Sequence, residues 1–405
     1  MKQGYRQTEA GAIPKGWMLD RIRNLALITT GAKNTQDKVD DGQYPFFVRS
    51  DNVERINTYS FSGEAVLTAG DGVGTGKVFH YINGDFDFHQ RVYKISNFAP
   101  TLDAYFFYLY FSTHFYERIM SMTAKSSVDS VRMEMIADMP VPLPPLPEQR
   151  AISSALRDAD ALITSLNQLI AKKHDIKRAT MQQLLTGKQR LPGFNRTGGK
   201  FKQTEVGGIP EDWGITEVGE ITRSHKQGFY TKNRYVDNGV RLVRITDLMN
   251  PLINYKEMPM LHIPRNDLEL YRVKVGDFLF ARSGAIGRYG IVYEPIEAIF
   301  GSYIIRFTFD SDKVKNEYFG FLYETEVVWK QLLSITQGSS NININAANIK
   351  SIKIPLPPIE EQCAITVVLW DMDAEIAALE LRRDKTRAIK QGMMQELLTG
   401  NTRLT

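Results

Sequence analysis

Residues 142–152 read PLPPLPEQRAI, and residues 355–365 read PLPPIEEQCAI, so the string recurs 213 residues later (355 − 142). The similarity continues behind the string at the same offset. Residues 184–187 read LLTG and return as residues 397–400, and an Arg-Leu pair follows each copy at Arg190 and Arg403. A long self-similarity at fixed spacing indicates that one structural unit is used twice, which decides the fold.

A second pair of strings begins each unit. Residues 5–17 read YRQTEAGAIPKGW and residues 201–213 read FKQTEVGGIPEDW, an offset of 196 (201 − 5). Between these heads and the Pro-rich strings the resemblance is faint, as in FVRSD at 47–51 beside VRITD at 243–247. Two copies of one fold with different surfaces predict that each copy recognises a different version of the same kind of target.

The segments behind the Pro-rich strings have the pattern of long amphipathic helices. Apolar residues recur at alternating steps of four and three, the spacing of a coiled-coil seam. The residues expected to pair the two helices are Ile152, Leu156, Ile163, Leu166, Ile365, Leu369, Ile376 and Leu379. A helix of roughly 40 residues makes a rod on the order of 60 Å long, which is unstable alone. We therefore expect the two helices to pack antiparallel against each other.

The residues around these helices predict where they begin and end. No Pro or Gly interrupts residues 148–186, and Gly187 and Gly400 stand where C-terminal caps are expected. The Pro residues should hold the chain extended and prevent helix before Glu148 and Glu361. A Pro-rich string can instead be a ligand for an SH3-like groove, but the position directly before a helix favours a rigid corner.

The bodies, roughly residues 18–141 and 214–354, contain short β-type runs separated by turn residues. Each also has a helical stretch rich in aromatic residues, around residues 102–120 and 316–333. The expected fold class is α+β, with two tandem α/β bodies, two long antiparallel coiled-coil helices and an internal pseudo-twofold repeat. The expected divisions are a first body at 1–141, a first helical region at 142–195, a second body at 196–354 and a second helical region at 355–405.

The composition is that of a soluble globular protein, with 405 residues, 43% hydrophobic and 24% charged. The formal net charge of +4 neither demands nor excludes a polyanionic partner. A single cysteine, Cys363, excludes a disulfide framework and any cysteine-based zinc site, and suits a reducing cytoplasm. No apolar run is long enough for a membrane span or a secretion signal. We therefore expect a cytoplasmic protein.

Motifs for catalysis are missing from the sequence. Residues 70–78 (GDGVGTGKV) fail as a phosphate-binding loop, because Asp71 stands where Gly is required and Val78 where Ser or Thr is required. We interpret them as a turn between strands. The six histidines show no metal-ligand spacing, and no Asn/Asp-Pro-Pro-aromatic element of an amino-methyltransferase exists. We expect no catalytic residues, no metal site and no cofactor bound by this chain.

Basic residues in the bodies are interleaved with small polar and aromatic residues, a pattern that favours contact with nucleic acid. The candidate DNA-binding residues of the first body are Lys33, Asn34, Arg49, Ser50, Lys77, Lys125 and Arg132. Those of the second body are Lys226, Lys232, Arg244, Arg282, Ser283, Ser340 and Asn341. Any single one of the basic residues could instead be a solvated surface charge. The Asn/Ile alternation at 337–345 could equally be a segment packed against the body.

The chain resembles the specificity subunits of type I restriction-modification systems over essentially its whole length. The resemblance rests on the paired PLPP-x-x-EQ-x-x-I strings, the LLTG ends of the helices and the paired QTE-x-G-x-IP-x-x-W heads. It implies that each body is a target recognition domain for one half of a split double-stranded DNA sequence, with the helices as spacer and docking surface. It also implies two methyltransferase subunits that carry S-adenosylmethionine, and motor-nuclease (restriction) subunits, as partners.

Two other functions compete with this interpretation. A self-sufficient DNA methyltransferase or nuclease is opposed by the missing motifs. A coiled-coil scaffold whose bodies bind proteins without sequence-specific DNA binding would be indifferent to DNA and insensitive to salt.

Overall fold

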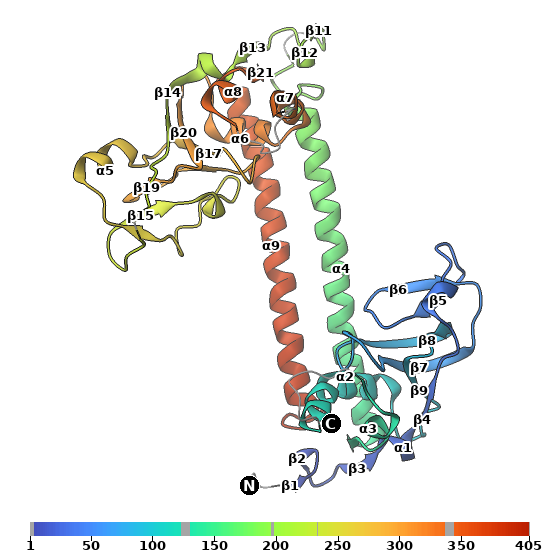
Figure 1. The fold of residues 1–405 in the computed structure, drawn as a ribbon. Coiled ribbons are helices and arrows are strands. Elements are labelled where there is room, and N and C mark those ends of the chain that lie inside the picture. The colour runs from blue at the N-terminus through green and yellow to red at the C-terminus, as the bar shows by residue number, and fades with distance from the viewer. Residues whose placement is uncertain (1–3, 123–129, 196–197, 233, 337–343, 405) are drawn as a thin grey trace. The chain divides into compact units, whose positions relative to one another are not determined.

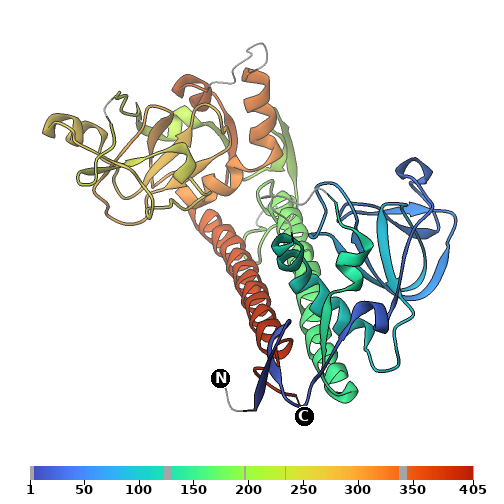
Figure 2. The same cartoon turned by 60° about the horizontal axis from the view of Figure 1, so that its bottom comes forward.

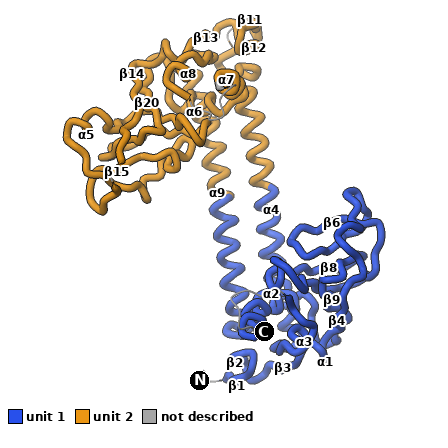
Figure 3. Tube along the Cα trace, viewed as in Figure 1, with its two compact units in different colours: residues 1–168, 380–405 blue, residues 169–379 orange. Residues whose placement is uncertain are grey.

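The computed structural model describes residues 4–122, 130–195, 198–232, 234–336 and 344–404. It divides into two compact units, residues 1–168 with 380–405 and residues 169–379 (Figure 3). Each unit holds one body and a stretch of both long helices, α4 (Leu146–Leu184) and α9 (Ile359–Leu397) (Figure 1). The two units are described separately below.

The first unit begins with a hairpin of β1 (Tyr5–Thr8) and β2 (Gly11–Pro14). Strand β3 (Met18–Arg21) pairs antiparallel with β10 (Pro140–Leu143) and so brings the two ends of the body together. Between them lie α1 (Ile22–Leu25), β4 (Leu27–Thr30), η1 (Thr35–Asp37), β5 (Tyr44–Phe47), β6 (Val53–Ile56), β7 (Phe61–Ala69), β8 (Phe79–Phe88), β9 (Val92–Ser96), α2 (Ala104–Ser121) and α3 (Met133–Ala137). The sheet order is β4-β9-β7-β8-β5-β6, and β5 pairs with β8 in parallel.

The second unit repeats this plan. Hairpin β11 (Phe201–Thr204) and β12 (Gly207–Pro210) precedes β13 (Gly214–Glu217), which pairs with β21 (Lys353–Leu356). The body contains η2 (Val218–Ile221), β14 (Thr222–Gln227), β15 (Val240–Val243), η3 (Ile245–Asp247), β16 (Met260–Leu261), α5 (Arg265–Tyr271), β17 (Asp277–Ala281), β18 (Tyr289–Ile291), β19 (Ala298–Phe300), β20 (Ile304–Phe309), α6 (Asn316–Tyr323), α7 (Glu326–Thr336) and α8 (Ala346–Lys350). Its strands form two sheets, β14-β20-β17-β18 and β16-β15-β19. The β15–β19 pair is parallel, as β5–β8 is.

Each body shares its core with the long helices. In the first unit α2 packs beside the first turns of α4 (Figures 1 and 2), and the core includes Ile152 and Leu156 of α4 with Leu397 from the end of α9. In the second unit the core includes Leu184 from the end of α4 with Ile365 and Leu369 of α9. In both units the start of one long helix therefore lies beside the end of the other, which confirms the antiparallel pairing.

Most positions of the expected seam are buried. Ile152, Leu156, Leu166, Ile365, Leu369 and Ile376 are buried, and Ile163 and Leu379 are half-buried. Two ion pairs of equal length add to the seam: Lys177 Nζ to Asp373 at 2.6 Å, and Lys390 Nζ to Asp160 at 2.6 Å. They are related by the repeat offset of 213 (390 − 177 and 373 − 160), so each pair fixes the antiparallel register in its own unit.

Two sequence expectations about helix bounds were wrong. The long helices begin at Leu146 and Ile359 rather than at the glutamates. Pro147 is tolerated in the first turn because the N–H groups there have no partner within the helix. The single helix expected around 316–333 is two helices, α6 and α7. The break lies at Thr325, whose hydroxyl donates to Leu322 O at 2.7 Å and whose carbonyl accepts the N–H of Trp329 at 3.0 Å.

The repeated strings meet at a junction around one buried carboxylate in each unit. In the second unit Glu361 accepts hydrogen bonds from Trp213 Nε1 at 3.0 Å and from Arg190 Nη2 at 2.7 Å. In the first unit Glu148 accepts from Trp17 Nε1 at 3.3 Å and from Arg403 Nη2 at 2.7 Å. The head string supplies the tryptophan, the Pro-rich string the glutamate, and the segment after LLTG the arginine.

The glutamine that follows each glutamate ties the helix start to its body. Gln149 is fully buried, accepts the N–H of Asp103 at 2.9 Å and donates to Thr101 O and Pro144 O, both at 2.9 Å. Gln362 makes the same three bonds, to Lys315 N, Lys313 O and Pro357 O. The amide satisfies backbone groups that burial would otherwise leave unpaired.

Glycine is required at the end of both long helices. Gly187 and Gly400 share a φ of +69°, a left-handed conformation that disfavours other residues. A Cβ on Gly187 would lie 2.5 Å from Pro210, and one on Gly400 would lie 2.6 Å from Pro14. The LLTG strings therefore pack closely against the proline and the tryptophan of a head string.

We predict that Glu361→Ala destabilises the second unit by about 1–3 kcal/mol, because buried Trp213 Nε1 loses its acceptor and Arg190 keeps only Asp212 as a carboxylate partner. The side chains of Glu361 and Arg190 are 1% and 7% exposed. Glu148→Ala should cost a similar amount, since buried Trp17 Nε1 loses its acceptor, whereas Arg403 is 35% exposed and can hydrate. Urea unfolding would measure both changes. Glu360→Ala, an exposed change in the same helical turn, serves as the control. Equal, small effects of all three changes would contradict the role of the junction.

Candidate nucleic-acid interface

A polar hollow of about 490 Å³ lies on the first body. Four segments line it: the segments that follow β4, β5 and β7, and the turn between β8 and β9. Its residues are Asn34, Thr35, Gln36, Arg49, Asp71, His89, Gln90 and Arg91. We call it hollow 1. The β5–β8 parallel pairing and the bridge between Lys33 and His89 bring these segments together.

Two guanidinium groups share one carboxylate in hollow 1. Arg49 Nη1 lies 3.0 Å from Asp71 Oδ1, and Arg91 Nη1 donates to Asp71 Oδ2. Burial works to raise the pKa of the Asp71 carboxyl, but the hydrogen bonds and charges of the two arginines outweigh it and hold the pKa below its usual range. The carboxylate therefore stays ionised, and the group of three carries one net positive charge.

The remaining polar groups of hollow 1 are also ordered by hydrogen bonds. Gln90 Nε2 donates to Asn34 Oδ1 at 2.6 Å. His89 is buried, and burial together with the charge of Arg49 lowers its pKa, so the imidazole is neutral at physiological pH. Its Nδ1 accepts the N–H of Arg91 at 3.0 Å. Hollow 1 thus presents amide and guanidinium groups in fixed orientations.

The second body has a hollow of about 530 Å³ in the same place of the fold, which we call hollow 2. Its residues are Phe229, Tyr230, Thr231, Lys232, Tyr235, Leu242, Arg244, Ile245, Thr246, Gly301, Ser302, Tyr303 and Ile304. Three of its tyrosines are exposed: Tyr230, Tyr235 and Tyr303. Hollow 2 is therefore aromatic where hollow 1 is charged.

The hydrogen bonds of the main chain show which positions of the two hollows correspond. His89 N donates to Phe47 O, and Gly301 N donates to Val243 O, both at 2.9 Å. This agrees with the pairing of residues 47–51 with 243–247 in the sequence. It makes Ile245 the counterpart of Arg49 and leaves Arg244 opposite Val48.

The turn that follows in each body has the same hydrogen bonds. Gly70 N donates to Arg91 O at 2.8 Å, as Arg282 N does to Tyr303 O at 2.9 Å. Arg91 therefore corresponds to Tyr303, and the residue after Gly70, Asp71, corresponds to Ser283. The two bodies share a backbone frame and differ in the side chains that it displays.

The structure gathers some of the candidate residues of the first body. Asn34 and Arg49 line hollow 1, with Lys33 and Ser50 adjacent to them in the chain. The glycine-rich segment is a turn between β7 and β8, as interpreted, and a Cβ on its Gly74 would lie 2.3 Å from Arg49 O. Lys77 in this turn is exposed, with Nζ 5.7 Å from the ring of Tyr116. The exposed Arg132 precedes α3, and Lys125 lies outside the described residues.

The candidates of the second body fall into two groups. Lys232 and Arg244 line hollow 2. Lys226 and Arg282 line another depression, beside Asn345, and Ser283 follows Arg282 in the chain. Lys226 Nζ lies 4.7 Å from the ring of Tyr271. Ser340 and Asn341, with most of the Asn/Ile stretch, lie outside the described residues.

Arg244 has an intramolecular role that the sequence did not suggest. It donates to Asp247 through Nε at 3.0 Å and through Nη2 at 2.8 Å, and Nη2 also lies 3.2 Å from Glu257 O. Asp247 is buried and also accepts the N–H of Arg244 at 2.8 Å. This bidentate pair holds the turn after β15.

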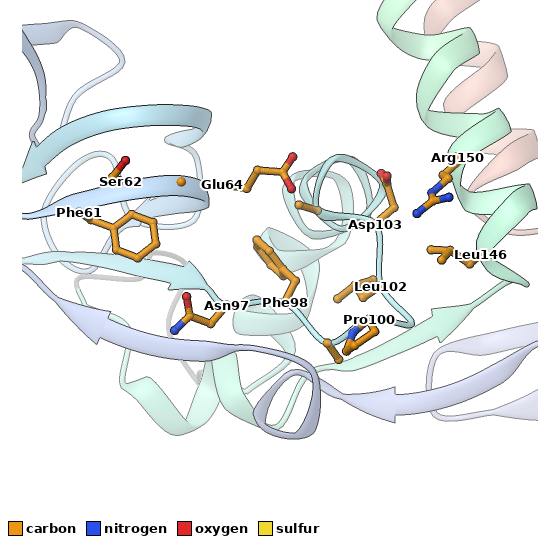
Figure 4. Close-up of a pocket in the computed structure, with 13 residues that line it drawn as sticks. Phe61, Ser62, Glu64, Asn97, Phe98, Pro100, Leu102, Asp103, Leu146 and Arg150 are labelled. Carbon is orange, nitrogen blue, oxygen red and sulfur yellow. The ribbon is translucent and has the colours of Figure 1, made fainter.

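Another hollow of the first unit, about 420 Å³, has a different character (Figure 4). Glu64, Asp103 and Arg150 are its charged residues, so it carries a net negative charge that opposes a nucleic acid. Asp103 caps α2 through Phe106 N at 2.8 Å and accepts the hydroxyl of Ser153 at 2.6 Å. We assign this hollow a structural role.

Sequence reasoning missed Asp71, His89, Gln90 and Arg91 in hollow 1, and the three tyrosines of hollow 2 as a group. The sequence did offer a signal for three of them, because polar residues that follow a strand or lie in a turn often bind ligands. Asp71 lies just after β7, and Gln90 and Arg91 lie in the turn between β8 and β9. Within the described ranges, no cluster of three or more His, Cys, Asp or Glu side chains is arranged to hold a metal ion. None of the helices in those ranges is both long enough and apolar enough to cross a membrane.

Comparison with known proteins gives a consistent result. The family described as "Type I restriction modification DNA specificity domain" matches residues 14–173 and 210–386. The chain is 26% identical to the type I restriction enzyme MjaVIII specificity subunit of Methanocaldococcus jannaschii, over 100% of this chain and 97% of that protein. It is 22% identical to the EcoDI specificity subunit of Escherichia coli, over 96% of this chain and 88% of that protein.

A solved structure agrees at the level of the fold. The crystal structure of the type I restriction-modification system S subunit from M. genitalium superposes with a TM-score of 0.60 at 16% identity, over 98% of this chain and 99% of that one. The family match spans both copies of the repeat, from the head strings into both long helices. The chain belongs to the family of type I restriction-modification DNA specificity subunits.

Proposed function

We propose that this chain is the recognition subunit of a type I restriction-modification complex and reads a split, asymmetric DNA sequence. The shared backbone frame of the two bodies, with Arg49, Asp71 and Arg91 replaced by Ile245, Ser283 and Tyr303, is the observation that supports it. One frame with two sets of side chains suits two different half-sites, one for each body. Because the bodies differ, the site should not be palindromic.

The chemistry of the hollows suits DNA. The excess guanidinium charge of hollow 1 can neutralise phosphate or bond the acceptor atoms of bases. Lys232 and the exposed tyrosines of hollow 2 can contact phosphate and the faces or methyl groups of bases. Helices of 39 residues on which both bodies are anchored can act as a spacer that sets the gap between half-sites.

We further propose that the chain itself is not catalytic and that its partners carry the chemistry. Methyltransferase subunits would dock on the long helices and bind S-adenosylmethionine, and motor-nuclease subunits would join for cleavage. A solved structure of similar fold, with a TM-score of 0.59 at 15% identity, concerns complex assembly of the type I restriction-modification system, which supports such partners. The cytoplasm, where DNA is found, is the expected place of action.

We predict that cells expressing this chain with its methyltransferase subunit modify one split, asymmetric sequence, and that the modification disappears when this chain is omitted. Methylation mapping across a genome would reveal both half-sites and the gap at once. Unchanged methylation without the chain, with the methyltransferase shown to be active, would favour a protein-binding scaffold instead.

We predict that shortening both long helices by one heptad shortens the gap by about three base pairs without changing either half-site. Seven helical residues span about 10 Å, and B-DNA rises about 3.4 Å per base pair. Deleting 165–171 and 378–384 keeps the seam in phase and retains both Lys–Asp pairs. Deletion from one helix alone is the control that should disrupt the pairing. An unaltered gap in the double deletion would contradict the spacer role.

For the second body, we predict that Arg244→Ala lowers stability by about 1–3 kcal/mol, because buried Asp247 loses its guanidinium partner. Lys232→Ala, at an exposed position in the same hollow, should change stability by less than about 0.5 kcal/mol and weaken binding to all DNA. Thermal unfolding and DNA titration would separate the two effects. An Arg244→Ala protein of normal stability would show that the Asp247 contact is not structural.

A further inference from the structure

In the group of Asp71 with its two arginines, the carboxylate orients a guanidinium before any ligand binds. An arginine oriented in this way is suited to hydrogen bonding with the edge of a base. The only partner that the described residues give the Arg91 guanidinium is Asp71, through Nη1. Its side chain is 61% exposed, whereas that of Asp71 is 17% exposed. The carboxylate thus holds the guanidinium through Nη1, and the exposed side chain has Nε and Nη2 left over for a ligand.

We infer that Arg91, oriented by Asp71, reads a guanine in the half-site of the first body, and that Tyr303 gives the second body a different reading at the same position. This inference rests on the proposed function, since it names the base that one of the two bodies recognises. Guanine offers two acceptors, N7 and O6, on its major-groove edge, and two parallel N–H groups of one arginine match them.

The surroundings favour a base edge over a phosphate. Asp71 neutralises one of the two guanidinium charges, so a phosphate would meet only one net positive charge in this group. A neutral base edge instead depends on the direction of the N–H donors, which the carboxylate helps to set. A guanidinium held in one orientation also loses less entropy on forming two hydrogen bonds. Asn34 and Gln90, hydrogen-bonded to each other in the same hollow, lie ready to contact an adjacent base.

Arg49 is the less suitable reader. Its side chain is 45% exposed, less than that of Arg91, and its carbonyl lies under the glycine-rich turn at Gly74. Its Nη1 holds the other oxygen of Asp71. We therefore assign Arg49 as a positioning residue, which keeps the carboxylate charged and in place so that Asp71 can orient Arg91.

The second body cannot make the same contact at the corresponding positions. Tyr303 offers a ring and a single hydroxyl, which cannot form two parallel hydrogen bonds to one base. Ser283 replaces the orienting carboxylate, and Ile245 replaces the second arginine. An apolar ring at this position suits a thymine methyl group or a base face. The turn between β8 and β9 in the first body and the turn between β19 and β20 in the second body thus carry different side chains. We expect this difference to give the two bodies different half-sites.

The test uses the complex of this chain with its methyltransferase subunit and the mapped target DNA. Each guanine of the target is replaced in turn by 7-deazaguanine, which lacks the N7 acceptor. We expect one such replacement, in one half-site, to weaken binding of the unmodified protein roughly 5- to 150-fold. Arg91→Ala should weaken binding to the natural target by a similar factor and remove the sensitivity to that replacement.

Three variants make the result specific. Arg91→Lys keeps the charge without the paired donors and should also lose the discrimination. Tyr303→Ala, the matched control in the other body, should leave the sensitivity to that replacement intact. Asp71→Asn should reduce discrimination at the same guanine while raising affinity for unrelated DNA, because a negative charge is removed. Circular dichroism would confirm that each variant is folded.

Other outcomes overturn the inference without touching the proposed function. If Arg91→Ala weakens binding to all DNA equally and lowers the salt dependence by about one phosphate contact, Arg91 binds the backbone. Absence of any guanine whose replacement depends on Arg91 would likewise exclude the assignment. In both cases the unmodified protein would still select two half-sites. Loss of sequence selection by the unmodified protein would instead refute the proposed function itself.

Discussion

The buried carboxylate at the start of each long helix is the interaction on which the rest of the structure depends. Glu148 and Glu361 are almost completely removed from solvent. A buried charge is costly unless an opposite charge and further hydrogen-bond donors surround it. An arginine and a tryptophan meet this need in each unit, and they come from two other segments of the chain. The head, the helix start and the helix end must therefore assemble together.

This requirement explains why the strings repeat while the bodies diverge. Every side chain of the junction has a partner in another string, so a change in one removes a hydrogen-bond or charge partner from a buried polar group. The order of the strings in space differs from their order in sequence. The helix end at 397–403 completes the first unit, to which the N-terminal head belongs, and the helix end at 184–190 completes the second. The repeat closes each unit with a segment from the other half of the chain.

The long helices and the two related bodies could be predicted from the sequence, because periodicity and repetition determine them. The heptad spacing indicated the antiparallel helices, and the matched strings indicated two related α/β bodies. It failed where long-range pairing decides. Asp71 and Arg91 come together because β7 and β9 are paired, which no local pattern indicates. Arg244 stays a candidate for contact with DNA, and the structure adds a local bond to buried Asp247, three residues further along the chain. At the break between α6 and α7, the Thr325 hydroxyl donates to Leu322 O, and its main-chain carbonyl accepts the N–H of Trp329.

The main chain of each hollow is held by its own hydrogen bonds, and the side chains at its turns are largely exposed. Substitutions at these turns can therefore change the DNA target without changing the fold. Main-chain bonds such as His89 N to Phe47 O and Gly301 N to Val243 O hold the hollows, so exposed side chains at the turns can be exchanged at little cost in stability. The charged set of hollow 1 is an exception. Asp71 without its arginines would be a half-buried charge lacking compensation, and the arginines without Asp71 would lose their fixed orientation. Residues of such a set should therefore change together, as they have between the two bodies of this chain.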